Sequence, residues 1–165
     1  MSDLTIYGLD DRTVLRILSE ATMELREGLP EAERSRAATE DEARAALVTL
    51  LDLGGQTSRI DAVNAVATPG AARALLSQLL ADPATRAIVA PVVSDPPEDT
   101  QKSIELATSG AIVLGALIAW LQTSFELVVQ RKDGKTDFSF RMRKKDTSAD
   151  LLSATAKAVE NILTR

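Results

Sequence analysis

The chain contains no cysteine and no histidine. The absence of cysteine excludes disulfides, thiolate nucleophiles and redox motifs, and the absence of both residues excludes Cys/His zinc sites. Serine chemistry that depends on a histidine base is excluded as well. Catalysis would have to rest on carboxylates, Lys, Arg, hydroxyls or Tyr7, and no spacing of these residues indicates a catalytic or metal site. We therefore expect no enzyme activity and no cofactor.

Basic residues are also in short supply, since the formal net charge is −5. This balance argues against general nucleic-acid binding, which needs clustered Lys and Arg. Residues 1–124 hold 10 basic and 18 acidic side chains, whereas residues 125–165 hold 9 and 6. The weakly basic carboxy-terminal part suits contact between subunits or with an anionic partner. The start of the chain, MSDLTIYGLDD, lacks the pattern of a signal peptide, so we expect a cytoplasmic location.

What the chain does have is one strongly apolar segment. No charged residue lies between Glu105 and Glu126, and residues 111–121 (AIVLGALIAWL) are apolar without a break. The segment predicts a helix over about residues 101–122. Such a helix is the core of the fold, a subunit interface or a membrane-inserting segment spanning residues 106–125. A bilayer needs about 20 apolar residues, so the uninterrupted run of 11 favours the core.

Small residues recur every four positions on this helix, and such a ridge lets another helix approach closely. If the helix is exposed, we expect its interface or membrane contacts to come from Ala111, Gly115, Ile118, Ala119 and Trp120. We expect Trp120 and Tyr7 to be packing residues rather than ligand stackers.

Further helices are predicted by apolar residues at helical spacing, together with capping residues. Asp10 or Asp11 caps a helix that Gly28 ends, and Thr39 with Glu42 forms a capping box for a second. A short helix over residues 58–66 and another from Thr68-Pro69 to before Asp82 follow. Two short stretches, residues 4–7 and residues 88–93, have strand-like patterns, and Pro91 would place the latter at a sheet edge.

The clearest tertiary signal is a β-hairpin around Asp133-Gly134, because Asp-Gly favours a two-residue type I′ turn. The register places Val129 opposite Phe138 and Leu127 opposite Phe140 on an apolar face. Glu126 is then opposite Arg141 on the polar face. A two-stranded hairpin is marginal alone, so we expect the last helix to cover its apolar face.

A basic patch accompanies this hairpin and comprises Arg131, Lys132, Lys135, Arg141, Arg143, Lys144 and Lys145. It is suited to anionic lipid headgroups. The alternative is a solvated hairpin edge whose lysines discourage edge-to-edge aggregation.

Together these patterns predict an α+β fold. We expect an amino-terminal helical part, residues 1–93, and a second part, residues 100–165, that holds the apolar helix, the hairpin and a terminal helix. The two parts are separated by the loop of residues 94–99 or belong to one compact domain. At 165 residues the chain is long enough to bury a core without disulfides or metals.

Residues 72–165 resemble the effector-associated constant component 1 proteins, a family predicted in bacterial conflict systems. The resemblance is carried, in order, by LLADP (residues 79–83), AIV (87–89), DPP (95–97), the small and apolar helix 109–121, the hairpin motif RKDGK (131–135) and a closing helix. It implies a non-enzymatic accessory module encoded beside proteases or nucleotide-dependent sensors in defence loci. It implies no catalytic residue.

Our leading hypothesis is therefore a non-enzymatic adaptor that couples a sensor to an effector by binding protein partners, and that self-associates. A second hypothesis is a membrane-acting component that inserts residues 106–125 and is then membrane-associated. An enzyme that uses carboxylates alone is the third, and no residue spacing supports it.

Overall fold

The computed structural model describes residues 6–34, 36, 39–55, 69–96, 109–142 and 149–163. Within these ranges the fold is α+β, mostly helical with one small antiparallel sheet, as predicted. The elements, in order, are α2 (Asp11–Glu27), α3 (Glu31–Arg34), α4 (Glu40–Leu53), α6 (Pro69–Ala81), α7 (Pro83–Ser94), α8 (Ser109–Ser124), β1 (Phe125–Lys132), β2 (Lys135–Met142) and α9 (Ala149–Leu163).

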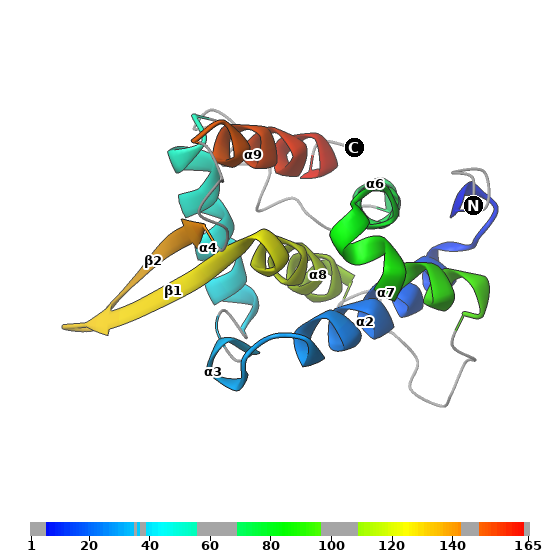
Figure 1. Cartoon of the computed structure of the whole chain (residues 1–165), viewed down its shortest axis with the longest axis horizontal. Helices are drawn as coiled ribbons and strands as arrows, with labels where there is room; N and C mark the ends of the chain where they lie inside the picture. Colours follow the sequence, from blue (N-terminus) through cyan, green and yellow to red (C-terminus); the bar gives the residue numbers. More distant parts are fainter. Residues whose placement is uncertain are drawn as a thin grey trace.

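The helices surround α8, which runs through the middle of the molecule (Figure 1). Its most extensive contact is with α2, and it also contacts α4, α6, α7 and β1. Helix α9 lies on the opposite side of α8 from α2 and packs on α4 and α6. The hairpin of β1 and β2 projects away from these helices, on the side where α4 lies (Figure 1). The amino-terminal helices and the carboxy-terminal elements thus contribute to one hydrophobic core.

Helix α8 is a central core helix, the alternative that the length of its apolar run favoured. Seven consecutive residues, 116–122, are buried, so this part of the helix has no solvent-facing side. An apolar helix needs such complete burial, because any exposed side would present hydrophobic surface to water. The polar groups within it have partners. The Trp120 indole N–H donates to Asp82 Oδ2 at 3.0 Å, and Gln122 Nε2 donates to the Glu33 carbonyl at 3.0 Å.

The predicted capping residues begin the helices where expected. Asp10 caps α2 by accepting a hydrogen bond from the Thr13 backbone N–H at 3.1 Å. Hydrogen bonding to the Thr13 side chain, and then to its backbone N–H, lowers the pKa of Asp10. Thr39 caps α4 in the same way, with the Glu42 N–H as donor at 3.1 Å. Gly28 and Gly54 end these two helices. The predicted apolar stripes of both helices are buried.

The strand-like pattern at residues 88–93 was misleading, because these residues belong to α7. Asp82 caps this helix and Pro83 occupies its first turn, a position where proline is tolerated. Val89, Val92 and Val93 have helical spacing and are buried together, so core packing overrides their β propensity. Pro91 interrupts the helix only three residues before its end.

The predicted strand at residues 4–7 is also wrong where the structure describes it, since Ile6 and Tyr7 are helical. The buried Ile6 side chain anchors this segment, and the Ile6 carbonyl accepts a hydrogen bond from the Leu9 N–H at 3.1 Å. Tyr7 is 66% exposed and is therefore not the packing residue that we expected. The predicted helix at residues 58–66 and the first part of the apolar helix, residues 101–108, lie outside the described residues.

Helix α4 approaches α9 closely at Gly54. A Cβ atom at this position would overlap the Cβ of Ala156 and lie 3.3 Å from the Leu50 carbonyl oxygen. Gly54 has a φ of −85°, which any residue adopts, so space rather than backbone conformation requires glycine here.

We predict that Gly54→Ala lowers the free energy of unfolding by about 1–3 kcal/mol, because α4 and α9 must separate to admit the methyl group. Gly28→Ala is the matched control. Gly28 also ends a helix at negative φ, but its added Cβ would make an ordinary contact of 3.5 Å with the Leu25 oxygen. Urea unfolding of both variants tests this, and equal losses would contradict the close approach of α4 and α9.

Candidate interaction surface

The hairpin has the predicted register. Val129 pairs with Phe138, Leu127 with Phe140, and Glu126 with Arg141. The turn residues Asp133 and Gly134 have φ values of 54° and 75°, and positive φ at both central positions defines the predicted type I′ turn. Lys132 and Lys135 flank the turn as a cross-strand pair. We refer to β1, the turn and β2 together as the arm.

The base of the arm is fixed to the core. Phe125 and Leu127 on β1 are buried, and the ring of Phe125 meets that of Phe140 edge to face, with centroids 6.4 Å apart. Helix α8 contacts β1 and helix α4 contacts β2. The main cover of the hairpin is therefore α4 and α8. Helix α9, which we expected in this place, packs instead on α4 and α6.

Two arginines attach the arm to the helical body. Arg36, which follows α3, donates a hydrogen bond of 2.8 Å to the Leu127 carbonyl and lies 3.4 Å from Glu126 Oε1. Further out, Arg131 Nη2 lies 3.0 Å from both carboxylate oxygens of Glu42, in the first turn of α4. A charge-assisted bond to the strand carbonyl is stronger than an exposed ion pair, so Arg36 is the more important attachment.

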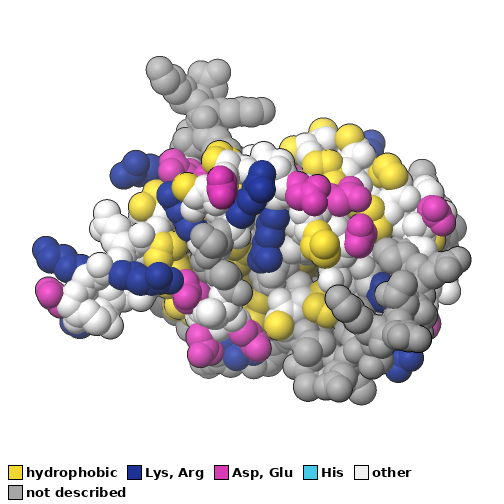
Figure 2. Space-filling view, turned by 90° about the horizontal axis from the view of Figure 1, so that it is seen from below, with side chains coloured by type: hydrophobic (Ala, Val, Ile, Leu, Met, Phe, Trp, Pro, Cys, Tyr) yellow, Lys and Arg dark blue, Asp and Glu magenta, His cyan; other side chains and the backbone are white. Residues whose placement is uncertain are grey.

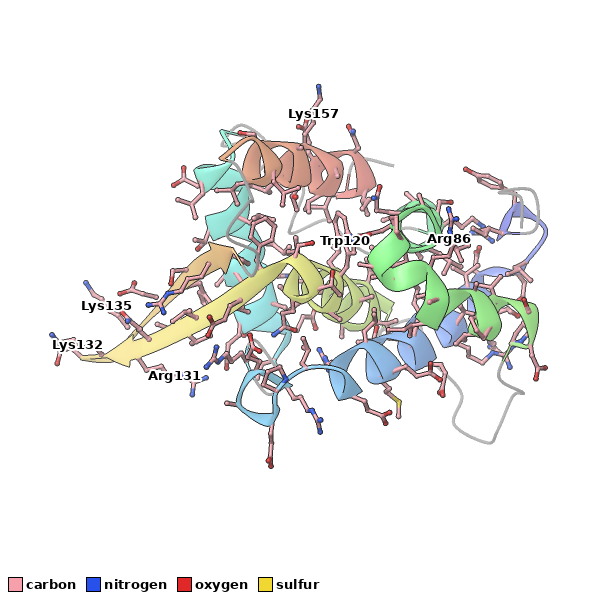
Figure 3. The ribbon with its side chains drawn as sticks, viewed as in Figure 1. Arg86, Trp120, Arg131, Lys132, Lys135 and Lys157 are labelled. Carbon is pink, nitrogen blue, oxygen red and sulfur yellow. The ribbon has the colours of Figure 1, made fainter. Side chains whose placement is uncertain are left out.

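Beyond these attachments the arm is exposed. Every residue from 130 to 137 is solvent-exposed. Lys132 and Lys135 extend from its tip, away from the helices (Figure 3). Lys and Arg side chains lie along the arm in the view from below, and acidic side chains are interspersed with them (Figure 2). The outer arm therefore presents a mixed surface with two free-standing lysines.

The structure separates the apolar candidates that the sequence grouped together. Ile118 and Ala119 are 1% exposed and Trp120 is 6% exposed, so all three are core residues. Ala111 is exposed and Gly115 is partly buried, at the end of α8 where α2 and α4 come together. No exposed apolar stripe runs along the described part of α8.

The basic candidates also differ from one another. Lys132, Lys135 and Arg141 are exposed, whereas Arg131 is engaged by Glu42. Arg143, Lys144 and Lys145 lie outside the described residues. Within the described part of the arm the basic patch thus reduces to the two lysines at the tip and Arg141, which is paired across the strands with Glu126.

Sequence reasoning missed the two body residues that hold the arm, Arg36 and Glu42. Arg36 is about 90 positions from its partners on β1, so no local pattern links them. Glu42 was recognised only as part of a capping box. Glu42 meets Arg131 of β1 only because α4 packs against the hairpin.

In the described residues, no group of three or more acidic side chains is placed to hold a metal ion. Within those same ranges, no helix has the length and hydropathy needed to cross a membrane. Comparisons with protein-family profiles, curated proteins and solved structures yield no match for this chain. The resemblance to effector-associated constant component 1 proteins therefore stays a prediction.

We predict that Arg36→Ala lowers the free energy of unfolding by about 1–2 kcal/mol, because the Leu127 carbonyl loses a charged donor. Arg131→Ala is expected to cost no more than about 1 kcal/mol, since it removes an ion pair in which Arg131 is 67% exposed. Arg12→Ala, an exposed arginine on α2, is the control and should be neutral. Urea unfolding measures the ranking, and a larger effect of Arg131→Ala would contradict it.

Proposed function

We propose that this protein is a non-enzymatic adaptor that binds a protein partner through its arm. The observation that carries the proposal is the projection of the arm, whose residues 130–137 are all exposed while its base is fixed in the core. A two-stranded hairpin is marginal in water unless something packs on it. This hairpin is held by core aromatics and two arginines, and such support suits a rigid recognition element.

The chemistry of the arm favours an acidic protein surface as its partner. Lys132 and Lys135 extend from the tip (Figure 3), but Asp133 lies in the turn between them and Asp137 follows two positions after Lys135. Lipid and nucleic-acid surfaces are typically bound by denser basic clusters. Residues 1–124 carry 18 acidic and 10 basic side chains, a clear acidic excess. An acidic partner is therefore attracted to the arm and repelled by the rest of the molecule.

The resemblance to the effector-associated constant component 1 proteins supplies the biological setting of the proposal. An accessory module of a bacterial defence system needs a body that displays a recognition element to a sensor or an effector. Self-association belongs to the same proposal, because the lysine tip of one copy is complementary to the acidic body of another.

Membrane insertion is the second candidate, supported by the apolar composition of α8. It requires α8 to leave a position in which residues 116–122 are buried on all sides. Release would expose the apolar core faces of α2, α4 and α6 to water, which costs free energy. The adaptor function requires no such exposure.

The proposal is tested with the double variant Lys132→Glu/Lys135→Glu, assayed for binding to the proteins encoded next to this chain in its genome. We expect binding, measured by calorimetry with the purified pair, to weaken by about 10-fold or more, because two attractive charges become repulsive. Lys157→Glu/Arg12→Glu makes the same charge change at exposed positions on α9 and α2 and should bind normally.

Two outcomes would contradict the adaptor function through the arm. One is equal loss of binding in both double variants, which would mean that only net charge matters. The other is flotation of the wild-type protein with anionic liposomes, lost in the arm variant, which would favour the membrane candidate. Sedimentation of the wild type and the arm variant tests self-association, which we expect the charge reversal to weaken.

A further inference from the structure

A second site lies away from the arm, in a cleft of about 240 Å³ where α2, α4 and α8 meet. Helix α2 contributes one face, with positions 19, 22, 23 and 26 at helical spacing. Helix α4 contributes its first turn and α8 contributes Ala111, Ile112 and Gly115. The cleft does not touch the arm, so what binds here is independent of the function proposed above.

Glycine and alanine keep this cleft open. The small residues Ala111 and Gly115 were predicted to form a ridge against which another helix packs closely. Here the side chain of Arg26 lies over the ridge instead, since a Cβ at Gly115 would be 3.5 Å from Arg26 Nη2. A larger residue at position 115 would fill the space that the guanidinium borders.

Arg26 is the unusual group of the cleft. Its Nε is buried, and no hydrogen-bond acceptor for it exists among the described residues. Burial lowers the pKa of Arg26, yet a guanidinium stays charged at any physiological pH. A buried donor without an acceptor is costly, and a charged one more so. Among the described residues, the Nε atoms of Arg16 and Arg44 are likewise buried without an acceptor, but of the three arginines only Arg26 lines the cleft. Arg26 is partly exposed, and burial rather than a neighbouring charge is what shifts its pKa.

Glu40 is the acidic residue in the cleft lining, but it does not pair with Arg26. Glu40 Oε1 lies 2.6 Å from Arg44 Nη2, an ion pair within α4. With Glu40 and Arg44 compensating each other, Arg26 leaves the cleft with one uncompensated positive charge. A planar guanidinium matches a carboxylate in a two-bond fork.

The remaining lining indicates the rest of the ligand. The Ser19 hydroxyl lies on the same face of α2 as Arg26, while the Thr22 hydroxyl donates to the Leu18 carbonyl at 2.6 Å. Thr39 also lines the cleft, where its hydroxyl accepts the Glu42 N–H at 3.1 Å. The apolar part of the lining includes Met23, which is exposed, and Ile112. One uncompensated positive charge with Met23 and Ile112 on the same cleft suits a singly charged acid with a short apolar portion better than a multiply charged phosphate.

We propose that this cleft binds the carboxylate of a small apolar acid through Arg26, with the apolar portion against Met23 and Ile112. The carboxylate belongs either to a free short-chain acid or to the carboxy terminus of a polypeptide. Both sources present the same group to the guanidinium, and the experiment below distinguishes them.

The test is an NMR titration of the full-length protein with sodium butyrate, in which the Arg26 Nε–Hε signal and the amides of α2 are followed. We expect saturable shifts at the cleft that butyramide and matched sodium chloride do not produce. Arg26→Gln should weaken butyrate binding by about 10-fold or more, because the charged fork is lost. Arg12→Gln removes the same charge from an exposed position on the same helix and should bind like wild type.

Steric variants give a second, independent readout. Gly115→Ala should still bind, and Gly115→Leu should not, because its side chain fills the cleft. A parallel titration uses N-acetylvaline in place of butyrate. Tighter binding of N-acetylvaline than of butyrate assigns the site to a polypeptide terminus. The reverse order assigns it to a free acid.

Three results would overturn the proposal. Butyrate shifts that sodium chloride or butyramide reproduces would show that no carboxylate is recognised. Unchanged binding in a folded Arg26→Gln protein would remove Arg26 from the site. An Arg26 Nε–Hε signal that responds to Glu40→Gln but not to butyrate would show that Glu40 is the partner of Arg26.

Discussion

The burial of residues 116–122 of α8 on every side is the constraint on which the other elements depend. A helix buried on every side needs a partner in every direction, and here α2, α4, α6, α7 and β1 supply them. Buried polar groups on such a helix must also find partners. Asp82 illustrates how one residue serves several elements, since its Oδ1 caps α7 while its Oδ2 accepts the Trp120 indole N–H. The junction of α6 and α7 is thereby tied to the central helix.

The position of the arm follows from the same constraint. Strand β1 begins at Phe125, directly after α8 ends at Ser124, so the hairpin continues directly from the central helix. Buried Phe125 and Leu127 continue the core into its base. Arg36 and Glu42 then hold it from the body side. An exposed outer arm on a firmly held base combines a defined direction with accessibility, which is what a recognition element requires.

Local signals in the sequence were sufficient for the elements whose stabilising interactions are local. Asp10 and Thr39 cap their helices through residues three positions away, and Asp133-Gly134 sets the hairpin register through the turn itself. The valines of α7 misled because their burial against the core, rather than their β propensity, decides the conformation.

The candidate sites depend on contacts that are far apart in sequence. Arg36 reaches Leu127 across 91 positions, and the Arg26 cleft exists only because α2, α4 and α8 converge. The ridge of small residues in the sequence did predict a close approach at Gly115. What occupies that space could not be deduced without knowing that α2 passes over it.

The fold and the proposed adaptor function both require α8 to be a permanent core helix. Native-state hydrogen exchange measures this directly, with the amides of residues 113–122 compared in buffer and with anionic liposomes. We predict that these amides are among the slowest to exchange, that they open only with global unfolding, and that liposomes do not change their rates. Exchange of α8 through a separate low-energy opening, accelerated by liposomes, would contradict a permanent core helix, because α8 would then be a segment that leaves the fold.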